Sequence, residues 1–293
     1  MITNTMNFLC AAIYKHFVLR PRRAARETKK ADGSGEMERK MIILVAAQRM
    51  GRFPEDRIYL PVQAGAALAE PVEGLRPDSA GDNISGKNRN YCELTAVYWA
   101  WKNLEGDAVG LNHYRRYFGG RRRWGDKWDR IAGEREIAAA LEKAPVVLPK
   151  KRNYLIETNY SQYVHAHHEQ DLALTREILA ALHPEALPVY DEVMGRTWGH
   201  RFNMFVMERP WLERYCAWLF PLLFRLEERL DISGYSDYDR RVFGFVAERL
   251  MDVWVESEGV PYTELPVVFT GKQNWWKKGT AFLRRKFFPE KKD

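Results

Sequence analysis

Short apolar runs alternate with amphipathic segments along the middle of the chain, and this alternation constrains the fold more than any other feature of the sequence. The run MIILVAA (41–47) is continuous and bounded by polar residues, which is typical of a buried parallel strand. Further apolar runs at 108–111, 146–148, 201–207 and 265–269 are also expected to be strands. The pattern predicts an α/β fold with a mixed, mostly parallel sheet flanked by helices.

The segments between these runs show helical periodicity. The first contains Leu94, Val97, Tyr98, Trp101 and Leu104 at spacings of three and four, and it ends at Gly106. The segment Tyr59–Leu75 is expected to be irregular or weakly helical. Further helices are predicted over Ile131–Lys143, Tyr160–Leu182, Pro184 to about Met194, Trp211–Leu230 and Tyr238–Val255.

The positive charge of the chain lies at its two ends. The chain of 293 residues carries +7, the first 40 residues +5 and residues 272–293 +6, which leaves −4 for residues 41–271. A protein that binds nucleic acid through its core should carry a basic face there, so no nucleic-acid partner is predicted. We divide the chain into a basic and apolar extension with a linker (1–39), a main domain (40–271) and a basic aromatic tail (272–293).

The composition of the two ends predicts contact with a membrane surface. The tail NWWKKGTAFLRRKFFPEKKD interleaves rings, which favour the membrane interface, with cations, which favour anionic headgroups. A solvated basic tail is the alternative. No apolar run is long enough to span a membrane, and the charge of the N-terminal segment follows its apolar run, unlike that of a signal peptide. Three widely spaced cysteines suit a reducing compartment. We therefore expect a cytoplasmic protein held peripherally at the inner membrane.

The stretch GLNHYRRYF (110–118) is the first candidate for a binding site, because ligands of open α/β sheets sit at the carboxyl ends of the strands. Arg115 or Arg116 could hold a phosphate through its planar fork, although neighbours on an extended chain point to opposite faces. His113 can donate to a phosphate or sugar oxygen, and Tyr114 or Tyr117 can stack on a base or sugar ring. The alternative is that these side chains pair with local carboxylates. Two more segments leave strand ends, Gln48-Arg49 and the loop from about Glu208.

Two further motifs could contact an anion or a metal. The loop GDNISGKN (81–88), which contains Asn83, Lys87 and Asn88, precedes a predicted helix start, where free N–H groups bind anions. The motif SDYDRR (236–241) holds Asp237 and Asp239, which either cap a helix, the interpretation that we favour, or bind Mg²⁺ or Mn²⁺, while Arg240 and Arg241 could reach an anion. No cofactor and no metal ligands are assigned firmly. His167 and Asp171 share a helix face but lack the further ligands that zinc needs.

Several long motifs resemble those of one protein family. They are GDNISGKNRNYCELTAVYWAWKNL followed by GLNHYRRYF, and then, in the same order as in the family, EVMGRTWGHRFNMFVMER, YCAWLFPLLFRLEERLDISGY, RRVFGFVAERLMDVW and ELPVV. The family serves bacterial capsular and exopolysaccharide biosynthesis. It was long described as a domain of unknown function and is regarded as glycosyltransferase-like. The resemblance covers roughly residues 41–270.

The resemblance implies a GT-A-like, Rossmann-like fold. It also implies transfer of a sugar from a nucleotide-sugar donor, a UDP-hexose, to a polyprenyl-linked or growing glycan in capsule, exopolysaccharide or O-antigen assembly. A non-catalytic interaction module of an assembly complex is the alternative. His113-Tyr114-Arg115 would occupy the place of the family's fold-typical Asp-x-Asp motif, with cations in place of a metal, and Asn203 would lie near the donor sugar. The residues considered for the general base are Asp82, Asp171 and Asp239. The first strand departs from the family because it ends in Ala47-Gln48-Arg49 instead of a Thr-His-Lys-like sequence, which leaves contacts of Gln48 and Arg49 with the base or ribose open.

Overall fold

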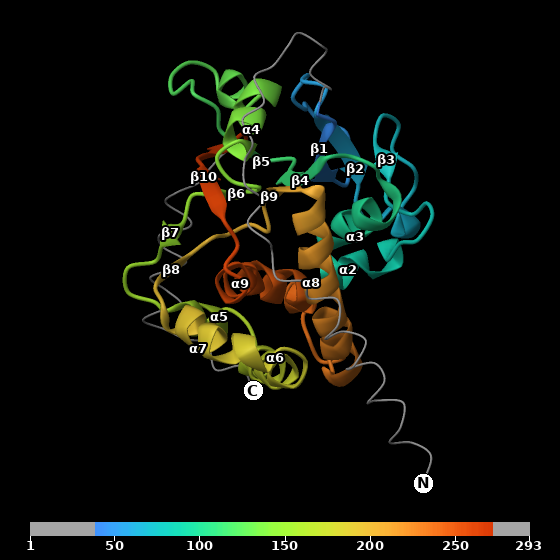
Figure 1. The fold of residues 1–293 in the computed structure, drawn as a ribbon. Coiled ribbons are helices and arrows are strands. Elements are labelled where there is room, and N and C mark those ends of the chain that lie inside the picture. The colour runs from blue at the N-terminus through green and yellow to red at the C-terminus, as the bar shows by residue number, and fades with distance from the viewer. Residues whose placement is uncertain (1–38, 272–293) are drawn as a thin grey trace. The chain divides into compact units, whose positions relative to one another are not determined.

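The computed structural model describes residues 39–271, which form a mixed sheet covered by helices on both faces (Figure 1). The strands pair in the order β10–β6–β9–β4–β1–β2–β3, and β5 joins β4 to β11. The pairs β1/β2, β1/β4, β2/β3 and β6/β10 are parallel, whereas β9 is antiparallel to both β4 and β6. The strands are β1 (Met41–Ala47), β2 (Tyr59–Gln63), β3 (Arg76–Pro77), β4 (Ala108–His113), β5 (Arg116–Phe118), β6 (Val146–Pro149), β9 (Phe205–Glu208), β10 (Tyr262–Leu265) and β11 (Val267–Phe269), and β7 (Arg152–Asn153) pairs with β8 (Trp198–Gly199) in a small second sheet.

Helices cover the two faces of the sheet unequally. On one face α3, α8 and α9 pack against apolar side chains such as Leu44 and Leu111. On the other face α4 packs against Val45 and Val147. Helices α5, α6 and α7 contact α8 and α9 and form a further layer (Figure 1). The α-helices are α2 (Asn88–Tyr91), α3 (Leu94–Asn103), α4 (Glu134–Leu141), α5 (Asn159–Val164), α6 (Glu169–Leu182), α7 (Leu187–Gly195), α8 (Arg209–Arg229) and α9 (Val242–Ser257).

The α/β class and the mostly parallel sheet expected from the sequence are confirmed. The predicted strand at 41–47 has the bounds of β1, and the predicted strands at 108–111 and 146–148 lie within β4 and β6. The helix predicted around Leu94–Leu104 is α3. These elements carry continuous apolar runs or a clear helical period, so their local pattern and their place in the core agree.

The expectation that Tyr59–Leu75 is irregular or weakly helical is wrong at its start, where β2 pairs with β1. Pro61 lies in this strand, and proline cannot donate to a ladder. Its nitrogen faces the side of β3, which pairs only with Val62 and Gln63. The absent N–H of Pro61 therefore costs no hydrogen bond, because β3 does not extend to this position. Burial of Val62 in the sheet stabilises the strand.

Two further expectations differ from the structure. The helix predicted over Tyr160–Leu182 is divided into α5 and α6, because His167 turns into the core and stacks on Phe245, with ring centroids 4.3 Å apart. The strand predicted over 201–207 begins only at Phe205. Asp239 begins the 3-10 turn Asp239–Arg241, as one interpretation of 236–241 expected, but its side chain does not cap a helix and is buried against Ser236 and His167.

The buried carboxylate of Asp78 holds together the loops that follow β2 and precede α3. Asp78 is fully buried and accepts hydrogen bonds from the backbone of Gly65 (2.9 Å) and Ala66 (3.0 Å). It also accepts bonds from the hydroxyls of Thr95 (2.6 Å) and Ser85. Four donors from three segments therefore converge on one carboxylate, and a buried charge with this many partners is strongly held.

Replacement Asp78→Ala should lower the free energy of unfolding by about 3 kcal/mol or more, because it leaves buried donors without an acceptor. Urea denaturation followed by circular dichroism measures this change. Asp82→Ala is the matched control, because Asp82 is exposed and its carboxylate accepts only a 3.3 Å bond from Tyr98. The control should change stability by less than about 0.5 kcal/mol. Equal effects of the two variants would contradict the central position given to Asp78.

Candidate functional site

The site is built where β4 ends and the chain enters β9. The antiparallel register pairs Leu111 with Phe205, so the residues just before β9 run alongside His113 at the carboxyl end of β4. The imidazole Nε2 of His113 lies 2.5 Å from the carbonyl oxygen of Phe202. These groups lie on the face of the sheet that α3 and α9 cover.

Glu93 and Asn203 complete the inner part of the site. Glu93 is the N-terminal cap position of α3, and its Oε1 lies 3.9 Å from Nε2 of His113. The amide nitrogen of Asn203 donates to Oε1 of Glu93 at 2.7 Å and to the carbonyl of Gly244 in α9 at 3.0 Å. The amide oxygen of Asn203 is buried and has no partner among the described residues. A buried polar atom without a partner is uncommon in a folded protein and marks this position as one to explain.

The backbone of the site adopts conformations that side chains normally avoid. Phe202 and Asn203 are consecutive residues with φ of 80° and 52°, and Cys92, next to Glu93, has φ of 53°. Such positions cost about 1–3 kcal/mol each and gather at functional sites, where the surrounding structure holds them. The N–H of Phe202 donates to Glu248 of α9 at 2.8 Å, which provides one of the restraints.

Three arginines surround this turn. The guanidinium carbon of Arg116 lies 4.6 Å from the ring centroid of Phe202, and that of Arg152 lies 5.4 Å from it. Nε of Arg241 donates to Sγ of Cys92 at 3.1 Å. Burial lowers the pKa of Arg116, and the charges of Arg152 and Arg241 lower it further.

Two carboxylates partly balance these cations. The charges of Glu248 and Glu93 raise the pKa of Arg116, against the effect of its burial. Both carboxylates lie within the cluster, Glu93 beside His113 and Glu248 beside the backbone of Phe202. With three guanidinium groups and one imidazole facing two carboxylates, the cluster can attract an anion.

The sequence-predicted residues of the β4 hairpin take different positions. His113 and Arg116 belong to the cluster, and the backbone of Arg116 pairs with that of His113 across the turn. Tyr114 and Arg115 form the exposed tip, where the Arg115 guanidinium lies 4.7 Å from the Tyr114 ring. Because the backbone turns between them, Arg116 rather than Arg115 faces Phe202.

The predicted residues near β1 and in the 81–88 loop are divided between the site and its surroundings. Gln48 donates to Asn88 at 3.3 Å, and Asn88 in turn donates to the carbonyl of Cys92 at 2.7 Å, so this pair adjoins the site. Arg49 is exposed. Lys87 forms a 2.6 Å ion pair with a glutamate of α8.

Asn83 and Arg240 do not contact the His113 cluster. The side chain of Asn83 donates to the carbonyls of Ser79 and Gly81 in its own loop. The guanidinium of Arg240 donates to the carbonyls of Tyr235 and Ser233. Each of these two side chains therefore stabilises its own loop. In the SDYDRR motif, the arginine that adjoins the site is Arg241.

None of the three carboxylates considered for the general base is in contact with His113. Asp82 lies beside Asn103, at the end of α3 opposite to Glu93. Asp171 is buried and accepts hydrogen bonds from Tyr163 (2.7 Å) and Tyr235 (2.6 Å), and burial raises its pKa. Asp239 is buried 3.2 Å from Nδ1 of His167.

Sequence reasoning missed Glu93, Glu248, Arg152 and Cys92 as members of the site. Glu93 fitted the role of a capping residue, and Glu248 lies in a helix whose period indicates only packing. Arg152 follows Pro149 in a short strand that the sequence does not predict. No signal in the sequence connects these residues, because they meet only through the fold.

The described residues contain neither a metal-binding cluster nor a helix that could cross a membrane. Within residues 39–271, no group of three or more His, Cys, Asp or Glu side chains is arranged to hold a metal ion. In the same residues no helix combines the length and apolar character needed to cross a bilayer. The predicted membrane contacts of the segments 1–39 and 272–293 fall outside the described residues.

Comparison with known proteins gives the family. Residues 42–259 match the domain of unknown function DUF4422, and the chain belongs to this family. The solved apo structure of the bifunctional glycosyltransferase WbbM is similar, with a TM-score of 0.74 and 29% sequence identity. The alignment covers 80% of this chain and 46% of the WbbM chain, so the chain spans less than half the length of that protein. No curated protein matches the chain. The resemblance to a former domain of unknown function with a GT-A-like glycosyltransferase fold is therefore confirmed.

The Cys92 thiol gives a direct test of the site's electrostatics. Burial raises its pKa to about 11, the charge of Glu93 raises it as well, and Arg241 lowers it. Because only the thiolate reacts, alkylation of Cys92 by iodoacetamide should still rise steeply between about pH 9 and about pH 10, roughly tenfold per pH unit. Mass spectrometry of the labelled peptide measures the rate. Cys216, which is fully buried, is the internal control and should remain unlabelled. A rate that levels off near about pH 9, as for an ordinary thiol, would contradict this environment.

Proposed function

We propose that the chain is a glycosyltransferase that moves a sugar from a nucleotide-sugar donor, a UDP-hexose, to a lipid-linked or growing glycan of a surface polysaccharide. The observation that carries the proposal is the cluster of His113, Arg116, Arg152 and Arg241 at the carboxyl end of β4, in a fold similar to that of WbbM. Open α/β folds bind nucleotides at this edge of the sheet.

The chemistry of sugar transfer explains the charge of the cluster. When the sugar leaves its donor, negative charge develops on the departing nucleoside diphosphate. Preorganised cations and hydrogen-bond donors stabilise that charge most where the site is partly buried. We assign this role to Arg116, Arg152 and His113. A Mg²⁺ or Mn²⁺ ion through Asp237 and Asp239 remains the metal-dependent version of the same proposal.

Asn203 and the two glutamates supply the other parts of the proposed reaction. We propose that Asn203 binds the donor sugar. Its unpaired amide oxygen could accept a hydrogen bond from a sugar hydroxyl once the strained turn moves. An acceptor hydroxyl needs a base within hydrogen-bond reach. Glu93 and Glu248 are the carboxylates beside His113 and Phe202, so we propose them for this role ahead of Asp82, Asp171 and Asp239.

The setting of the reaction is proposed from the sequence. A polyprenyl-linked acceptor would lie at the cytoplasmic face of the inner membrane, and the basic aromatic tail 272–293 would hold the protein there. Assembly of capsule, exopolysaccharide or O-antigen is the process we propose.

Titration with UDP and UDP-hexoses, followed by calorimetry, tests the donor site. We expect binding to the wild type, and Arg116→Gln should weaken it roughly tenfold or more, because a charge-assisted hydrogen bond contributes about 1.5–3 kcal/mol. Arg115→Gln should have a smaller effect, because Arg115 is at the exposed hairpin tip. Lys87→Gln is the control and should leave affinity unchanged, since Lys87 is paired to Glu227 on α8.

The same titration separates the proposal from its alternatives. Loss of binding on addition of EDTA would favour the metal-dependent version. Absence of binding to UDP and to every UDP-hexose, with or without Mn²⁺, would contradict a donor site and favour the non-catalytic interaction module. Transfer of radiolabelled hexose to a membrane extract is the corresponding measurement of activity.

A further inference from the structure

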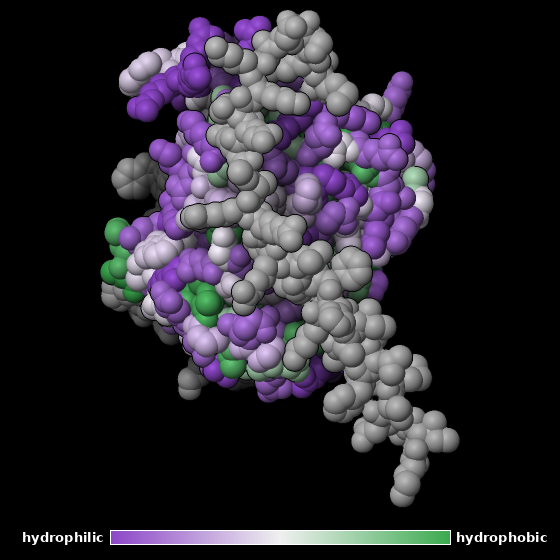
Figure 2. Space-filling model, viewed as in Figure 1, coloured by the Kyte–Doolittle hydropathy of each residue, from purple (hydrophilic) through white to green (hydrophobic). Residues whose placement is uncertain are grey.

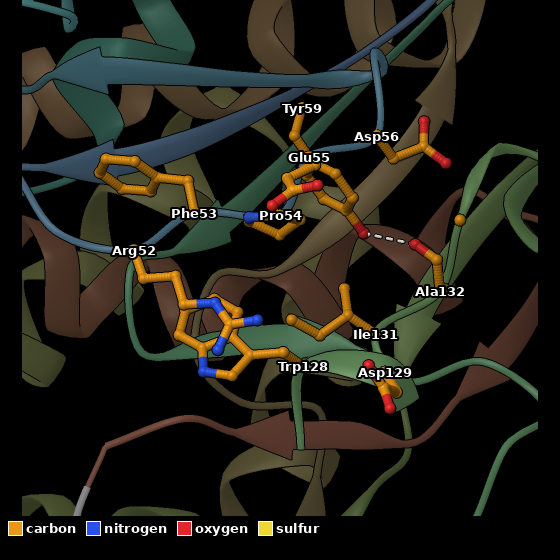
Figure 3. Close-up of a pocket in the computed structure, with 11 residues that line it drawn as sticks. Arg52, Phe53, Pro54, Glu55, Asp56, Tyr59, Trp128, Asp129, Ile131 and Ala132 are labelled. Carbon is orange, nitrogen blue, oxygen red and sulfur yellow. Dashed lines mark hydrogen bonds between the residues drawn. The ribbon is translucent and has the colours of Figure 1, made fainter. Parts of the chain in front are cut away.

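A hollow lies on the face of the sheet that carries α4, apart from the His113 cluster. It is a cavity of about 290 Å³ between the loop that joins β1 to β2 and the segment that precedes α4, with Trp128, Arg52 and Glu55 among its lining residues (Figure 3). Small-molecule sites usually have volumes of about 300–1,000 Å³. The cavity is therefore at the small end of that range and suits one ring better than a whole nucleotide. We call it the Trp128 pocket.

Aromatic and apolar groups form part of its wall. Figure 3 shows Arg52 across the ring of Trp128, and its guanidinium carbon lies 4.7 Å from the ring centroid. Tyr59 is held in place because its hydroxyl donates to the carbonyl of Ala132 at 2.7 Å. Phe53 and Ile131 add apolar surface. A ligand with a flat apolar face can pack against the indole if Arg52 swings aside.

The charged groups of the pocket select against anions. The lining includes one arginine, Arg52, and three carboxylates, those of Glu55, Asp56 and Asp129. Asp56 already accepts bonds from the backbone of Ile58 and Glu134, and Asp129 pairs with Arg122, but Glu55 is exposed and forms no ion pair within residues 39–271. A phosphate or a carboxylate ligand would meet this negative charge. A neutral ligand with many hydroxyls would find acceptors in Glu55 and donors in Arg52.

We propose that the Trp128 pocket binds one neutral sugar residue of the acceptor glycan, a proposal that rests on the proposed function. A hexose has a face of C–H groups, which packs on an indole, and a rim of hydroxyls, which exchange hydrogen bonds with Glu55 and Arg52. The pocket would thus hold an uncharged part of the substrates, whereas the nucleotide of the donor is negatively charged.

The strand β5 connects this pocket with the candidate donor site. Arg116 faces Phe202 in the site, while its neighbour Tyr117 turns to the other face of the strand. The Tyr117 ring lies 5.9 Å from that of Trp128 and 6.1 Å from that of Tyr59. The pocket therefore lies on the opposite face of β5 from the site, and the sugar that it binds is distal to the reacting end of the acceptor.

Saturation-transfer NMR of the full chain with methyl glycosides of glucose, galactose, mannose and N-acetylglucosamine at millimolar concentration tests the pocket. We expect at least one glycoside to receive saturation, strongest at its C–H protons. Trp128→Ala should abolish the transfer. Trp124→Ala is the matched control from the same loop, because Trp124 does not line the pocket and should leave the transfer unchanged.

Glu55→Gln is a second variant, needed because Trp128→Ala could fail to fold. Glu55 is exposed, so this change should leave the circular dichroism spectrum unaltered. It should weaken glycoside binding roughly fivefold or more, because it removes a charged hydrogen-bond acceptor. Absence of transfer to every glycoside would overturn the pocket, as would equal loss in Trp124→Ala. UDP titration of the same samples keeps the two proposals apart. Wild-type protein that binds UDP but no glycoside would overturn the pocket and leave the donor site standing.

The loop between β5 and α4 exposes a tryptophan next to three arginines. Trp124 is 86% exposed, and Arg121, Arg122 and Arg123 directly before it are exposed as well. Arg122 pairs with Asp129 at 3.2 Å, whereas Arg121 and Arg123 form no salt bridge within residues 39–271. The loop lies beside α4 at the top of Figure 1, and Figure 2 shows mostly hydrophilic surface there.

We infer that the Arg121–Trp124 loop contacts an anionic lipid surface. An indole prefers the interface between headgroups and acyl chains, and arginines beside it attract anionic headgroups. The charge complementarity favours a bilayer, and this contact belongs to the described domain, separately from the tails.

Co-sedimentation of the full chain with vesicles of equal parts phosphatidylglycerol and phosphatidylcholine tests the loop. The variant R121Q/R122Q/R123Q should partition roughly tenfold or more weakly, and Trp124→Ala should partition several-fold more weakly. R89Q/R225Q/R229Q, which removes three exposed arginines elsewhere, is the charge-matched control and should partition like the wild type. Deletion of 272–293 measures the contribution of the tail in the same assay. Equal partitioning of the loop variant and the wild type would overturn this inference, as would an equal loss in the control.

Discussion

The antiparallel insertion of β9 between β4 and β6 is the constraint on which the rest of the site depends. In a fully parallel sheet the chain would leave β9 at the carboxyl edge, and the residues before β9 would lie at the opposite edge. Because β9 runs against β4, the chain instead enters it beside His113. The turn at Phe202 and Asn203 therefore lies at the edge where α/β sheets bind ligands. One reversed strand thus brings residues about ninety positions apart in sequence into contact.

This turn is strained, and a layer of buried polar groups holds it. Glu93 and Glu248 restrain Asn203 and Phe202 from opposite sides. Behind them lie two buried arginines: Arg201 donates to the carbonyl of His200 at 2.9 Å, and Arg249 donates to the carbonyl of Phe245 at 2.9 Å.

The environment of Arg249 shows how closely these charges lie. Burial lowers the pKa of Arg249, the charge of Arg201 lowers it further, and Glu248 raises it. Glu248 therefore lies within the field of the buried guanidinium groups, beside the strained turn whose Phe202 N–H donates to it.

The sequence predicts the framework of the molecule better than its site, and particular residues show why. The run 41–47 and the helix around Leu94 depend on neighbours in sequence, whose pattern can be read directly. His113 was predicted because it follows a strand. Asn203 was predicted through the family resemblance, and the structure brings it to the edge of the same cluster. Glu93, Glu248 and Arg152 could not be predicted, because their proximity arises from the packing of α3, α9 and β7 around the turn. Asp171, in contrast, was predicted as a candidate base and lies outside the site. It follows a histidine-rich stretch in the sequence, but its carboxylate accepts hydrogen bonds from two buried tyrosine hydroxyls.

The candidate donor site and the Trp128 pocket lie on either side of β5 and differ in charge, and this difference is a consequence of strand geometry. Successive side chains of a strand point to opposite faces, so Arg116 and Tyr117 necessarily serve two environments. Arg116 joins a group rich in guanidinium, whereas Tyr117 supports the wall of a pocket rich in carboxylate. A nucleotide would be repelled from the second environment and attracted to the first, and a neutral glycan would lose nothing in the second. In the proposed function, the consecutive residues Arg116 and Tyr117 of one short strand would therefore separate the nucleotide from the neutral glycan by charge.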